Sequence, residues 1–209
     1  MNITPDHWLQ GVYRQPLAGG SRMVVRRFLV IHFTSGWSAQ SSVDFWNTPE
    51  AMGASAHVII DRDGTVNQCR PFDRTCGHAG KSRWKDPSTG ITYDGLNSCA
   101  IGIELANAGD MLRSPDIYPK SMSAIGGQTI PRLTARHKNG GPLSQWEIYQ
   151  PVQLKALEIV AKAICERYNI DDLVGHDDIA PDRKNDPGPA FPMDSLRHAC
   201  GFTKPLGKL

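Results

Sequence analysis

The sequence lacks any hydrophobic run long enough to cross a lipid bilayer, which takes roughly 20 apolar residues. Residues 1–7 contain neither a basic stretch nor an apolar run, so no Sec-type signal peptide is expected there. Internal repeats and low-complexity tracts are also missing. The sequence therefore predicts a protein that is made in the cytoplasm without a signal peptide and that has no membrane span.

Neither sign of charge dominates. Charged residues make up 21% of the 209 residues, and the formal net charge is +2. This balance argues against a disordered chain and against a general nucleic-acid binder, although a mild basic excess suits approach to an anionic polymer. Hydrophobic residues make up 40% of the chain, which is enough for one domain with a real core.

Evidence for a disulfide framework is also missing. The cysteines number five, an odd count, and without a signal peptide this indicates reduced thiols. Cys69, Cys76 and His78 lie close together in the sequence and raise the question of a metal cluster. Their spacing matches no zinc pattern, so we interpret the two cysteines as strand and loop thiols.

The most distinctive stretch that is present is the polar segment 175–189. It contains one histidine, four aspartates, two cations, three prolines and two glycines. The prolines exclude a helix interior and a central strand, so we expect a rigid loop. It follows Leu173–Val174, the end of a short apolar run, and α/β proteins often place their chemistry after such a strand. His176 and Asp186, with Lys184 beside them, suit an open, catalytic metal site.

The rest of the chain predicts alternating strands and helices. After an irregular lead-in at 1–22, the segment 23–31 has strand character and carries His32 at its end. Asp63-Gly64 between two β-rich runs indicates a hairpin. A proline followed by apolar residues at helical spacing predicts a helix over 151–168. The other expected elements are a helix at 38–46, strands at 55–61, 65–68 and 100–105, a loop region at 69–98, a loop insertion at 107–145 and a helix at 192–198.

Two histidines end apolar runs. A lone histidine in such a position is more often structural than a ligand. However, His32 and His176 can meet at one edge of a parallel or mixed sheet, and with Asp186 they leave a fourth position for water, as in catalytic zinc sites. Spacing alone does not decide the matter. The Asp-Pro-Gly context favours Asp186, because Pro187 and Gly188 fix the local backbone. The remaining aspartates of this region are interpreted as loop or cap residues: Asp177, Asp178, Asp182 and Asp194.

Four other polar residues need an interpretation, and for two of them both a structural and a functional one are open. Glu104 stands in an apolar run, where a carboxylate is costly unless it is paired or functional. It is either an ion-pair partner of a loop arginine or a general base with a pKa raised by burial. Lys184 is either a solvated surface lysine or a cation that stabilises a developing oxyanion. His57 is interpreted as structural, and His78, in Gly-His-Ala-Gly, as a candidate substrate contact.

Four stretches together resemble the motifs of the zinc-dependent N-acetylmuramoyl-L-alanine amidases of the amidase-2 type. They occur in the family's order and cover roughly residues 24 to 198, so the joint pattern is far more specific than any single piece. The stretches are 28–34 (Phe-Leu-Val-Ile-His-Phe-Thr), 55–60 with 63–66, 78–80 with 97–104, and 175–181 with 183–189.

The resemblance implies an α/β fold with a mixed, mostly parallel central sheet flanked by helices. It implies a single catalytic domain over 23–209 with the long loop insertion 107–145. The reaction implied is hydrolysis of the amide between the lactyl group of N-acetylmuramic acid and L-alanine, with peptidoglycan or muropeptides as partners. The residues implied are His32, His176 and Asp186 as ligands of one zinc ion, Glu104 as catalytic base, Lys184 as oxyanion partner, and His78 and Asn97 as substrate contacts.

The sequence departs from the family pattern at two positions. Ala56 stands where phage-lysozyme-like and recognition-protein relatives have a tyrosine near the zinc, which places more weight on Glu104. Gly77 stands where many relatives have a tryptophan, which removes the basis for expecting aromatic stacking at that point of the substrate groove.

The biological role has three alternatives. The chain is an endolysin released through a membrane lesion, a secretion-system effector that reaches the periplasm, or a cytoplasmic recycler of anhydro-muropeptides. The absence of a wall-binding module suits Gram-negative targets, and a long insertion suits an extended groove. We therefore expect a wall-degrading lysis enzyme or effector that acts on the cell wall in the periplasm.

Two other classes of protein compete with an enzyme. A recognition module that binds muropeptides without cutting them typically loses a zinc ligand, whereas this sequence has all three candidates and Glu104. A plain scaffold with unrelated polar loops would have no affinity for zinc.

Overall fold

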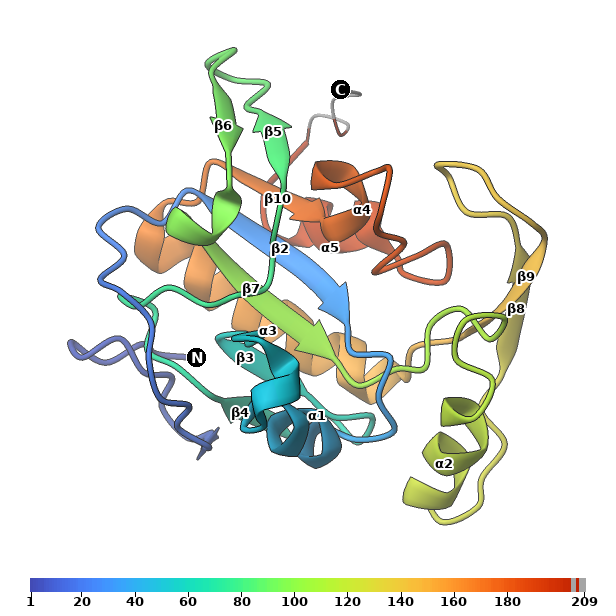
Figure 1. Cartoon of the computed structure of the whole chain (residues 1–209). Helices are drawn as coiled ribbons and strands as arrows, with labels where there is room; N and C mark the ends of the chain where they lie inside the picture. The colour runs from blue at the N-terminus through green and yellow to red at the C-terminus, as the bar shows by residue number, and fades with distance from the viewer. Residues whose placement is uncertain (204–205, 207–209) are drawn as a thin grey trace.

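The centre of the structure, a computed structural model, is a six-stranded sheet with the order β1-β4-β3-β7-β2-β10 (Figure 1). Only the β3–β4 pair is antiparallel. This confirms the predicted α/β fold with a mixed, mostly parallel sheet. The strands are β1 (Tyr13–Arg14), β2 (Phe28–Phe33), β3 (Val58–Ile60), β4 (Val66–Gln68), β7 (Ala100–Leu105) and β10 (Asp172–Gly175).

The structure describes residues 1–203 and 206. The end of the predicted domain, residues 204–205 and 207–209, lies outside this part. Within it, no helix combines the length and the apolar character that crossing a membrane requires.

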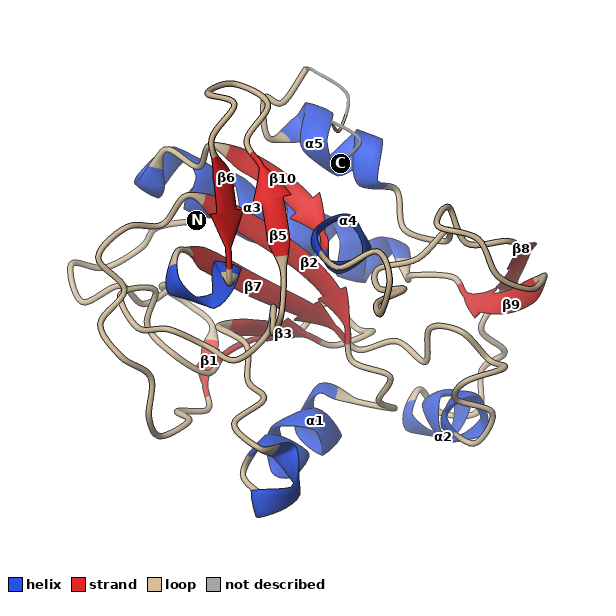
Figure 2. Ribbon diagram, turned by 45° about the horizontal axis from the view of Figure 1, so that its top comes forward, coloured by secondary structure: helices blue, strands red, loops and turns tan. Residues whose placement is uncertain are grey.

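Helices lie on both sides of the sheet. The long helix α3 runs behind it in Figure 2, and α1 packs on the opposite side of β3 through Val43. The predicted helices at 38–46, 151–168 and 192–198 are confirmed. Ser38 caps α1 by accepting from the Ser41 amide, and Pro151 opens α3. The helices are α1 (Ala39–Trp46), α2 (Ile117–Ala124), α3 (Pro151–Tyr168), α4 (His176–Ile179) and α5 (Met193–Ala199), with 3-10 turns at Pro49–Ala51 and Leu96–Ser98.

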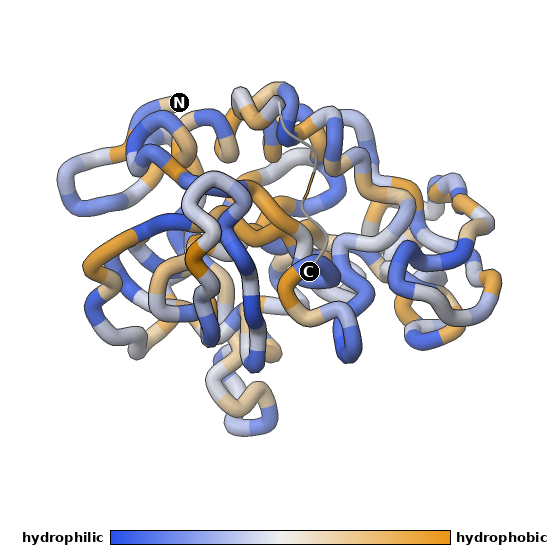
Figure 3. Tube along the Cα trace, turned by 90° about the horizontal axis from the view of Figure 1, so that it is seen from above, coloured by the Kyte–Doolittle hydropathy of each residue, from blue (hydrophilic) through white to orange (hydrophobic). Residues whose placement is uncertain are grey.

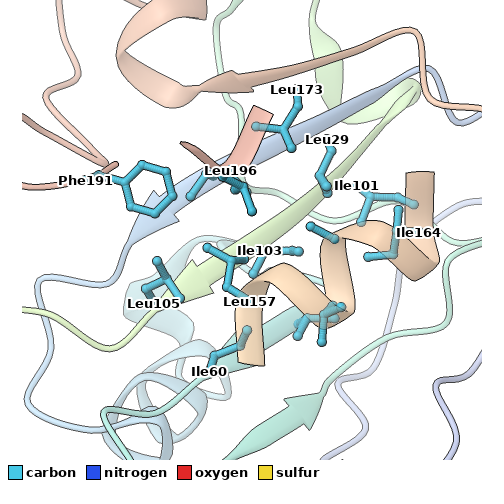
Figure 4. Packing of buried hydrophobic residues seen from close by; sticks show 14 of the residues in the cluster. Leu29, Ile60, Ile101, Ile103, Leu105, Leu157, Ile164, Leu173, Phe191 and Leu196 are labelled. Atoms are coloured by element: carbon cyan, nitrogen blue, oxygen red, sulfur yellow. The ribbon is translucent and has the colours of Figure 1, made fainter. Parts of the chain in front are cut away.

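The main core lies between the sheet and α3. Leu29, Ile101 and Ile103 of the strands pack against Leu157 and Ile164 of the helix (Figure 4). Coloured by hydropathy, apolar stretches cross the middle of the molecule, and the outer loops mix hydrophilic and apolar stretches (Figure 3). Burial of large aliphatic side chains of this kind supplies most of the driving force for folding.

The other face of the same strands is where the polar residues lie. Phe28 and Val30 pack there against Trp84 in a second apolar cluster. Because side chains alternate along a strand, this face also carries His32 and Glu104, which stand opposite each other in the β2–β7 register. The carboxyl ends of β2 and β7 point toward the side of the molecule that holds α2, β8 and β9 (Figure 1). The register thus places two polar side chains at one edge of the sheet.

The prediction of plain loops at 69–98 and 107–145 is wrong in part. The first region forms a small hairpin, β5 (Arg83–Lys85) with β6 (Thr92–Asp94). The second contains α2 and strand β8 (Arg132–Ala135), which pairs with β9 (Ser144–Glu147). Each of these elements has only three to eight residues, which is too short for a clear hydrophobic periodicity in the sequence.

Two boundaries also differ from the prediction. The strand expected at 23–31 begins at Phe28, because Val24 and Val25 are 73% and 46% exposed and pair with no strand. The polar segment is not loop throughout. It begins with the single helical turn α4, where the Asp178 carboxylate accepts from the Gly175 amide at 2.7 Å.

A buried ion pair joins the sheet to the insertion. Arg62, just after β3, donates to both carboxylate oxygens of Glu147 in β9, at 2.6 and 3.0 Å, and each side chain is 1% exposed. The same guanidinium donates to the Trp37 carbonyl at 2.6 Å and to the Ser121 hydroxyl of α2 at 2.7 Å. One cation therefore ties together the segment before α1, the β3–β4 turn, α2 and β9.

Replacing Glu147 with alanine should destabilise the protein by about 3–5 kcal/mol, because it leaves the Arg62 charge buried and unpaired. Urea denaturation measures this free energy. Asp94→Ala is the control, since it breaks an exposed pair at 3.7 Å with Arg83 and should cost less than about 0.5 kcal/mol. Equal losses in the two variants would contradict a structural role for the buried pair.

Candidate metal centre

The strand register brings the two predicted histidine ligands together. In the β10–β2 pair, Gly175 lies opposite Ile31, so the residues that follow, His176 and His32, emerge side by side. Their Nδ1 atoms are 2.9 Å apart although 144 residues separate them in the sequence. Two parallel neighbours thus deliver two imidazoles to the same point.

The third predicted ligand returns to this point from the polar segment. Asp186 Oδ2 lies 2.9 Å from Nδ1 of His32 and 2.9 Å from Nδ1 of His176. The Asp186 carbonyl accepts from the Asp177 amide at 2.8 Å, which ties the end of the segment to α4. All three side chains are buried, and their candidate ligand atoms lie within 4.8 Å of one another.

A hydrogen-bond chain fixes the proton on His32. His78 Nε2 lies 3.1 Å from the Ala100 carbonyl, which can only accept, so this nitrogen carries the proton. His78 Nδ1 is then an acceptor, and it receives the Nε2–H of His32 at 3.0 Å. The remaining nitrogen of His32, Nδ1, is therefore unprotonated and has a free lone pair.

His176 is oriented in the same way. Its Nε2 lies 3.2 Å from the Ala79 carbonyl, so the proton is on Nε2 and the lone pair on Nδ1. Arg183 holds that carbonyl in place, because its Nη2 donates to Ala79 at 2.6 Å and to the Lys81 carbonyl at 2.8 Å. Outer hydrogen bonds of this kind set the tautomer and the direction of a metal-binding histidine.

The resulting donor set fits a cation. Two unprotonated nitrogens and a carboxylate oxygen face one another at 2.9 Å in a buried place, and such lone pairs repel unless positive charge lies between them. A zinc ion with tetrahedral ligands at about 2.0–2.2 Å would separate the ligand atoms by about 3.3–3.6 Å. A small outward shift is enough to admit the ion, and three protein ligands leave its fourth position open.

The protonation states agree with this assignment. Burial lowers the pKa of His32 to about 4, and His176 acts in the same direction, so the His32 ring is neutral near pH 7. A neutral imidazole is the form of histidine that binds a metal.

Glu104 lies in the same cavity with one carboxylate oxygen unused. Its Oε2 is buried and has no hydrogen-bond partner within the described part of the chain. Burial, helped by the negative charge of Asp186 and opposed by the positive charge of Lys184, raises the pKa of Glu104 to about 8. The loop arginine that would make Glu104 a structural ion-pair partner is missing from the described ion pairs. An unpaired carboxylate with a pKa near neutrality suits general-base chemistry.

The metal centre opens into a cavity of about 760 Å³. Lys184 lines it, and no described carboxylate lies within ion-pairing distance of its ammonium group. The wall on the α1 side is aromatic, with Trp37, Phe45 and Trp46, of which Trp37 and Phe45 are 39% and 50% exposed. The cavity therefore combines a cation near the ligands with exposed aromatic faces farther along.

The two predicted substrate contacts lie in different places. His78 lines the cavity but is 7% exposed and bonded to His32 and Ala100. Asn97 is not among the cavity residues. Its side-chain oxygen accepts from the amides of His78 and Ala79 at 3.1 and 2.7 Å. Contact of either residue with substrate stays a prediction, and the structure gives both a part in holding the ligand His32.

The insertion contributes a clamp that the sequence did not reveal. We use the term hairpin clamp for residues His137, Lys138 and Asn139, between β8 and β9. His137 Nε2 lies 2.8 Å from Asp177 Oδ2, and the side-chain amide of Asn139 donates from Nδ2 to the Asp177 carbonyl at 2.7 Å. Lys138 pairs with Asp177 and Asp178 at 2.8 and 2.6 Å. The hairpin clamp thus braces the turn that begins with His176.

Comparisons with known proteins agree with the geometry. The family model Amidase_2, described as N-acetylmuramoyl-L-alanine amidase, matches residues 21–189. The N-acetylmuramoyl-L-alanine amidase AmiD of Escherichia coli (strain K12) is 33% identical over 192 residues, which are 88% of this chain and 55% of AmiD. The 1,6-anhydro-N-acetylmuramyl-L-alanine amidase AmpD of the same strain is 32% identical over 145 residues, 68% of this chain and 56% of AmpD. The chain spans about half the length of the curated relatives it matches.

Solved structures show the same fold. The crystal structure of a selenomethionine AmpD derivative has a TM-score of 0.61 and 25% identity, and the match covers 95% of this chain and 99% of that one. AmiD from E. coli in complex with the substrate anhydro-N-acetylmuramic acid-L-Ala-D-γ-Glu-L-Lys has a TM-score of 0.60 and 27% identity, and covers 94% of this chain and 65% of that one.

The raised pKa of Glu104 leads to a testable effect on stability. Its folded value of about 8 exceeds the ordinary 4.5, so between these values the folded chain holds a proton that the unfolded chain releases. The contribution of Glu104 to stability is therefore present below the ordinary pKa and is lost as pH rises through 8. Metal-free Glu104→Gln should gain stability relative to the metal-free parent as pH rises from 5 to 8.

Urea denaturation in the presence of a chelator measures this difference at each pH. Glu158→Gln is the matched control, because hydrogen bonding to Lys162 lowers the pKa of this surface carboxyl and gives it no reason to share the trend. A Glu104→Gln difference that is the same at pH 5 and pH 8 would show that Glu104 titrates normally.

Proposed function

Since the chain belongs to the Amidase_2 family of N-acetylmuramoyl-L-alanine amidases, we propose that it hydrolyses the amide between N-acetylmuramic acid and L-alanine with one zinc ion. The observation that carries the proposal is the convergence of His32, His176 and Asp186 beside the unpaired carboxylate of Glu104. The substrate we propose carries the L-Ala-D-γ-Glu sequence of the peptide bound by AmiD.

The roles of the ligands follow from their surroundings. His32 and His176 are held with their lone pairs toward the site by His78 and by the Ala79 carbonyl, so little rearrangement is needed when the ion enters. When bound, zinc supplies Lewis acidity, which lowers the pKa of a water molecule to about 7 and polarises a carbonyl. Because all three side chains are buried, water does not compete with them for the ion from the protein side.

Glu104 handles the proton in this mechanism. Its free oxygen takes a proton from the attacking water and passes it to the nitrogen of the leaving L-alanine, as a general base and then a general acid. Its pKa of about 8 in the metal-free chain reflects burial, and any cation bound at His32 and Asp186 lowers it. A carboxyl whose pKa lies near neutrality can both accept and return a proton.

Lys184 stabilises the charge that develops on the substrate oxygen. It stands two residues before Asp186 in the proline-braced segment and lines the cavity. Its ammonium group has no carboxylate partner among the described residues to neutralise it. A fixed cation near a developing oxyanion contributes about 10² to 10³ in rate.

We propose intact cell wall in the periplasm as the target of this activity. The support is the size of the cavity, about 760 Å³, and the insertion that extends the wall around it. AmpD is named for 1,6-anhydro-muramyl compounds, which are soluble fragments. A recycling role in the cytoplasm therefore remains the competing assignment, and the choice between them depends on which substrate is cut.

Purified sacculi and a soluble anhydro-muropeptide separate these roles when each is incubated with the protein and the products are analysed by mass. We expect free stem peptides from both substrates, loss of cleavage with a chelator, and recovery with zinc. Cleavage of the soluble compound alone would replace the wall-degrading role with recycling, and cleavage of neither would contradict the proposed reaction.

Two substitutions separate metal binding from turnover. Glu104→Ala should keep the zinc content of the parent and lose about 10² to 10⁴ in kcat, because only proton transfer is removed. His176→Ala should lose both zinc and activity, because two protein ligands remain. Zinc content by elemental analysis and kcat on the soluble muropeptide are the measurements. Unchanged kcat in Glu104→Ala would remove Glu104 from the mechanism.

A further inference from the structure

A second cavity adjoins the metal centre. It has a volume of about 380 Å³ and lies between the insertion and the end of the polar segment. Trp146 and His137 stand in it with their rings 5.8 Å apart. The two cavities adjoin each other, and we refer to the pair as the cleft. They share four lining residues: Arg113, Arg183, Lys184 and Asn185.

The walls of the second cavity are held in place. On one side the hairpin clamp fixes residues 137–139 to Asp177 and Asp178, within 2.8 Å at each contact. On the other side a tight turn follows Asp110, whose carbonyl accepts from the amides of Arg113 and Ser114 at 3.0 Å each. Hydrogen bonds and ion pairs therefore fix both walls of the second cavity.

Asp110 anchors that turn and is itself occupied. It is 7% exposed, accepts from the Ser144 hydroxyl, and accepts from the Leu112 amide at 3.0 Å. The Met111 amide donates to Gln145 of β9 at 3.0 Å. The backbone of Arg113 is thus fixed relative to β9, while its side chain remains 66% exposed and reaches both cavities.

The three cations at the junction differ in what they already bind. The Arg183 guanidinium is occupied by the carbonyls of Ala79 and Lys81. Arg113 makes only a long contact, 3.6 Å from Nε to Asp110, and its terminal nitrogens are free for a ligand in the described part of the chain. In the proposed reaction Lys184 stabilises the charge on the substrate oxygen. Arg113 is therefore the cation at this junction that is left to bind another negatively charged group of the substrate.

We propose that the second cavity binds the stem peptide and that Arg113 binds the free α-carboxylate of its γ-linked glutamate. This inference rests on the function proposed above. A glutamate joined through its γ-carboxyl keeps its α-carboxylate, and this is the first negative charge beyond the L-alanine whose amide is cut. An arginine fork matches a carboxylate in shape and charge.

The assignment gives the substrate a direction in the cleft. The sugar lies on the aromatic wall of Trp37, Phe45 and Trp46, where apolar ring faces are available. The peptide leads away from the metal centre past Lys184 toward Arg113. The insertion then acts as the peptide-binding side of the active site.

A pair of soluble substrates tests the inference. The first is N-acetylmuramic acid-L-Ala-D-γ-Glu-L-Lys, and the second has the glutamate α-carboxylate replaced by a carboxamide. For the zinc-loaded parent we expect a KM about tenfold lower for the carboxylate compound, with kcat within about twofold. Arg113→Gln should raise KM for the carboxylate compound about tenfold and leave KM for the carboxamide unchanged. Loss of the discrimination is the signature, since a general defect would raise both.

Arg83→Gln is the matched control. Arg83 is 67% exposed and makes a 3.7 Å contact with Asp94, close to the values of Arg113, but it lies on the β5–β6 hairpin outside both cavities. It should keep the discrimination of the parent. An Arg113→Gln enzyme that still prefers the carboxylate compound would overturn the inference.

Calorimetric binding separates this inference from the proposed reaction. In the Glu104→Gln background we expect the carboxylate compound to bind about tenfold more tightly than the carboxamide, and Arg113→Gln to abolish the difference. If the parent cuts neither compound, the proposed reaction fails, and the binding difference alone supports the subsite. Equal binding of the two compounds would overturn the subsite whether or not the parent cleaves them.

Discussion

The parallel register of β10, β2 and β7 is the constraint on which the rest of the molecule depends. It sets Gly175 against Ile31 and His32 against Glu104, so three chemically active side chains emerge at one edge of the sheet. Because a strand slipped by one residue turns every side chain to the other face, the packing of the aliphatic residues on α3 also fixes which way these polar groups point. Stability and chemistry are set by the same alternation.

Around this edge, most of the polar contacts serve to hold the ligands still. The carbonyls of Ala100 and Ala79 place the ring protons of His78 and His176 on Nε2. The side chain of Asn97 holds the backbone amides of His78 and Ala79. On the far side the hairpin clamp braces the turn after His176. The inner groups are thus few, and the supporting groups come from segments spread over the whole chain, as is usual for metal centres.

The sequence singled out His32, His176, Asp186, Glu104 and Lys184, which the structure brings to one cavity, and it predicted helix α3, because motif order and helical period are local signals. The chemical roles of these five residues stay predictions. It did not predict the hairpin clamp or the Arg62–Glu147 pair, whose partners lie about 40 and 85 residues apart, since neither has a period or motif. His78 shows a third case. Its glycine-flanked context suggested an exposed contact, yet it fits in the interior because Gly102 leaves room, and a Cβ there would lie 2.5 Å from the ring.

The positions of the three ligands along the chain have a consequence for unfolding. His32 belongs to the first strand of the core, and its two companions lie 144 and 154 residues later. Unfolding would separate these ligands, so an ion held among them would bind the folded chain and not the unfolded one. Its binding free energy would then add to the free energy of unfolding, and loss of the ion would weaken the contact between the segments around residue 32 and residues 176–186.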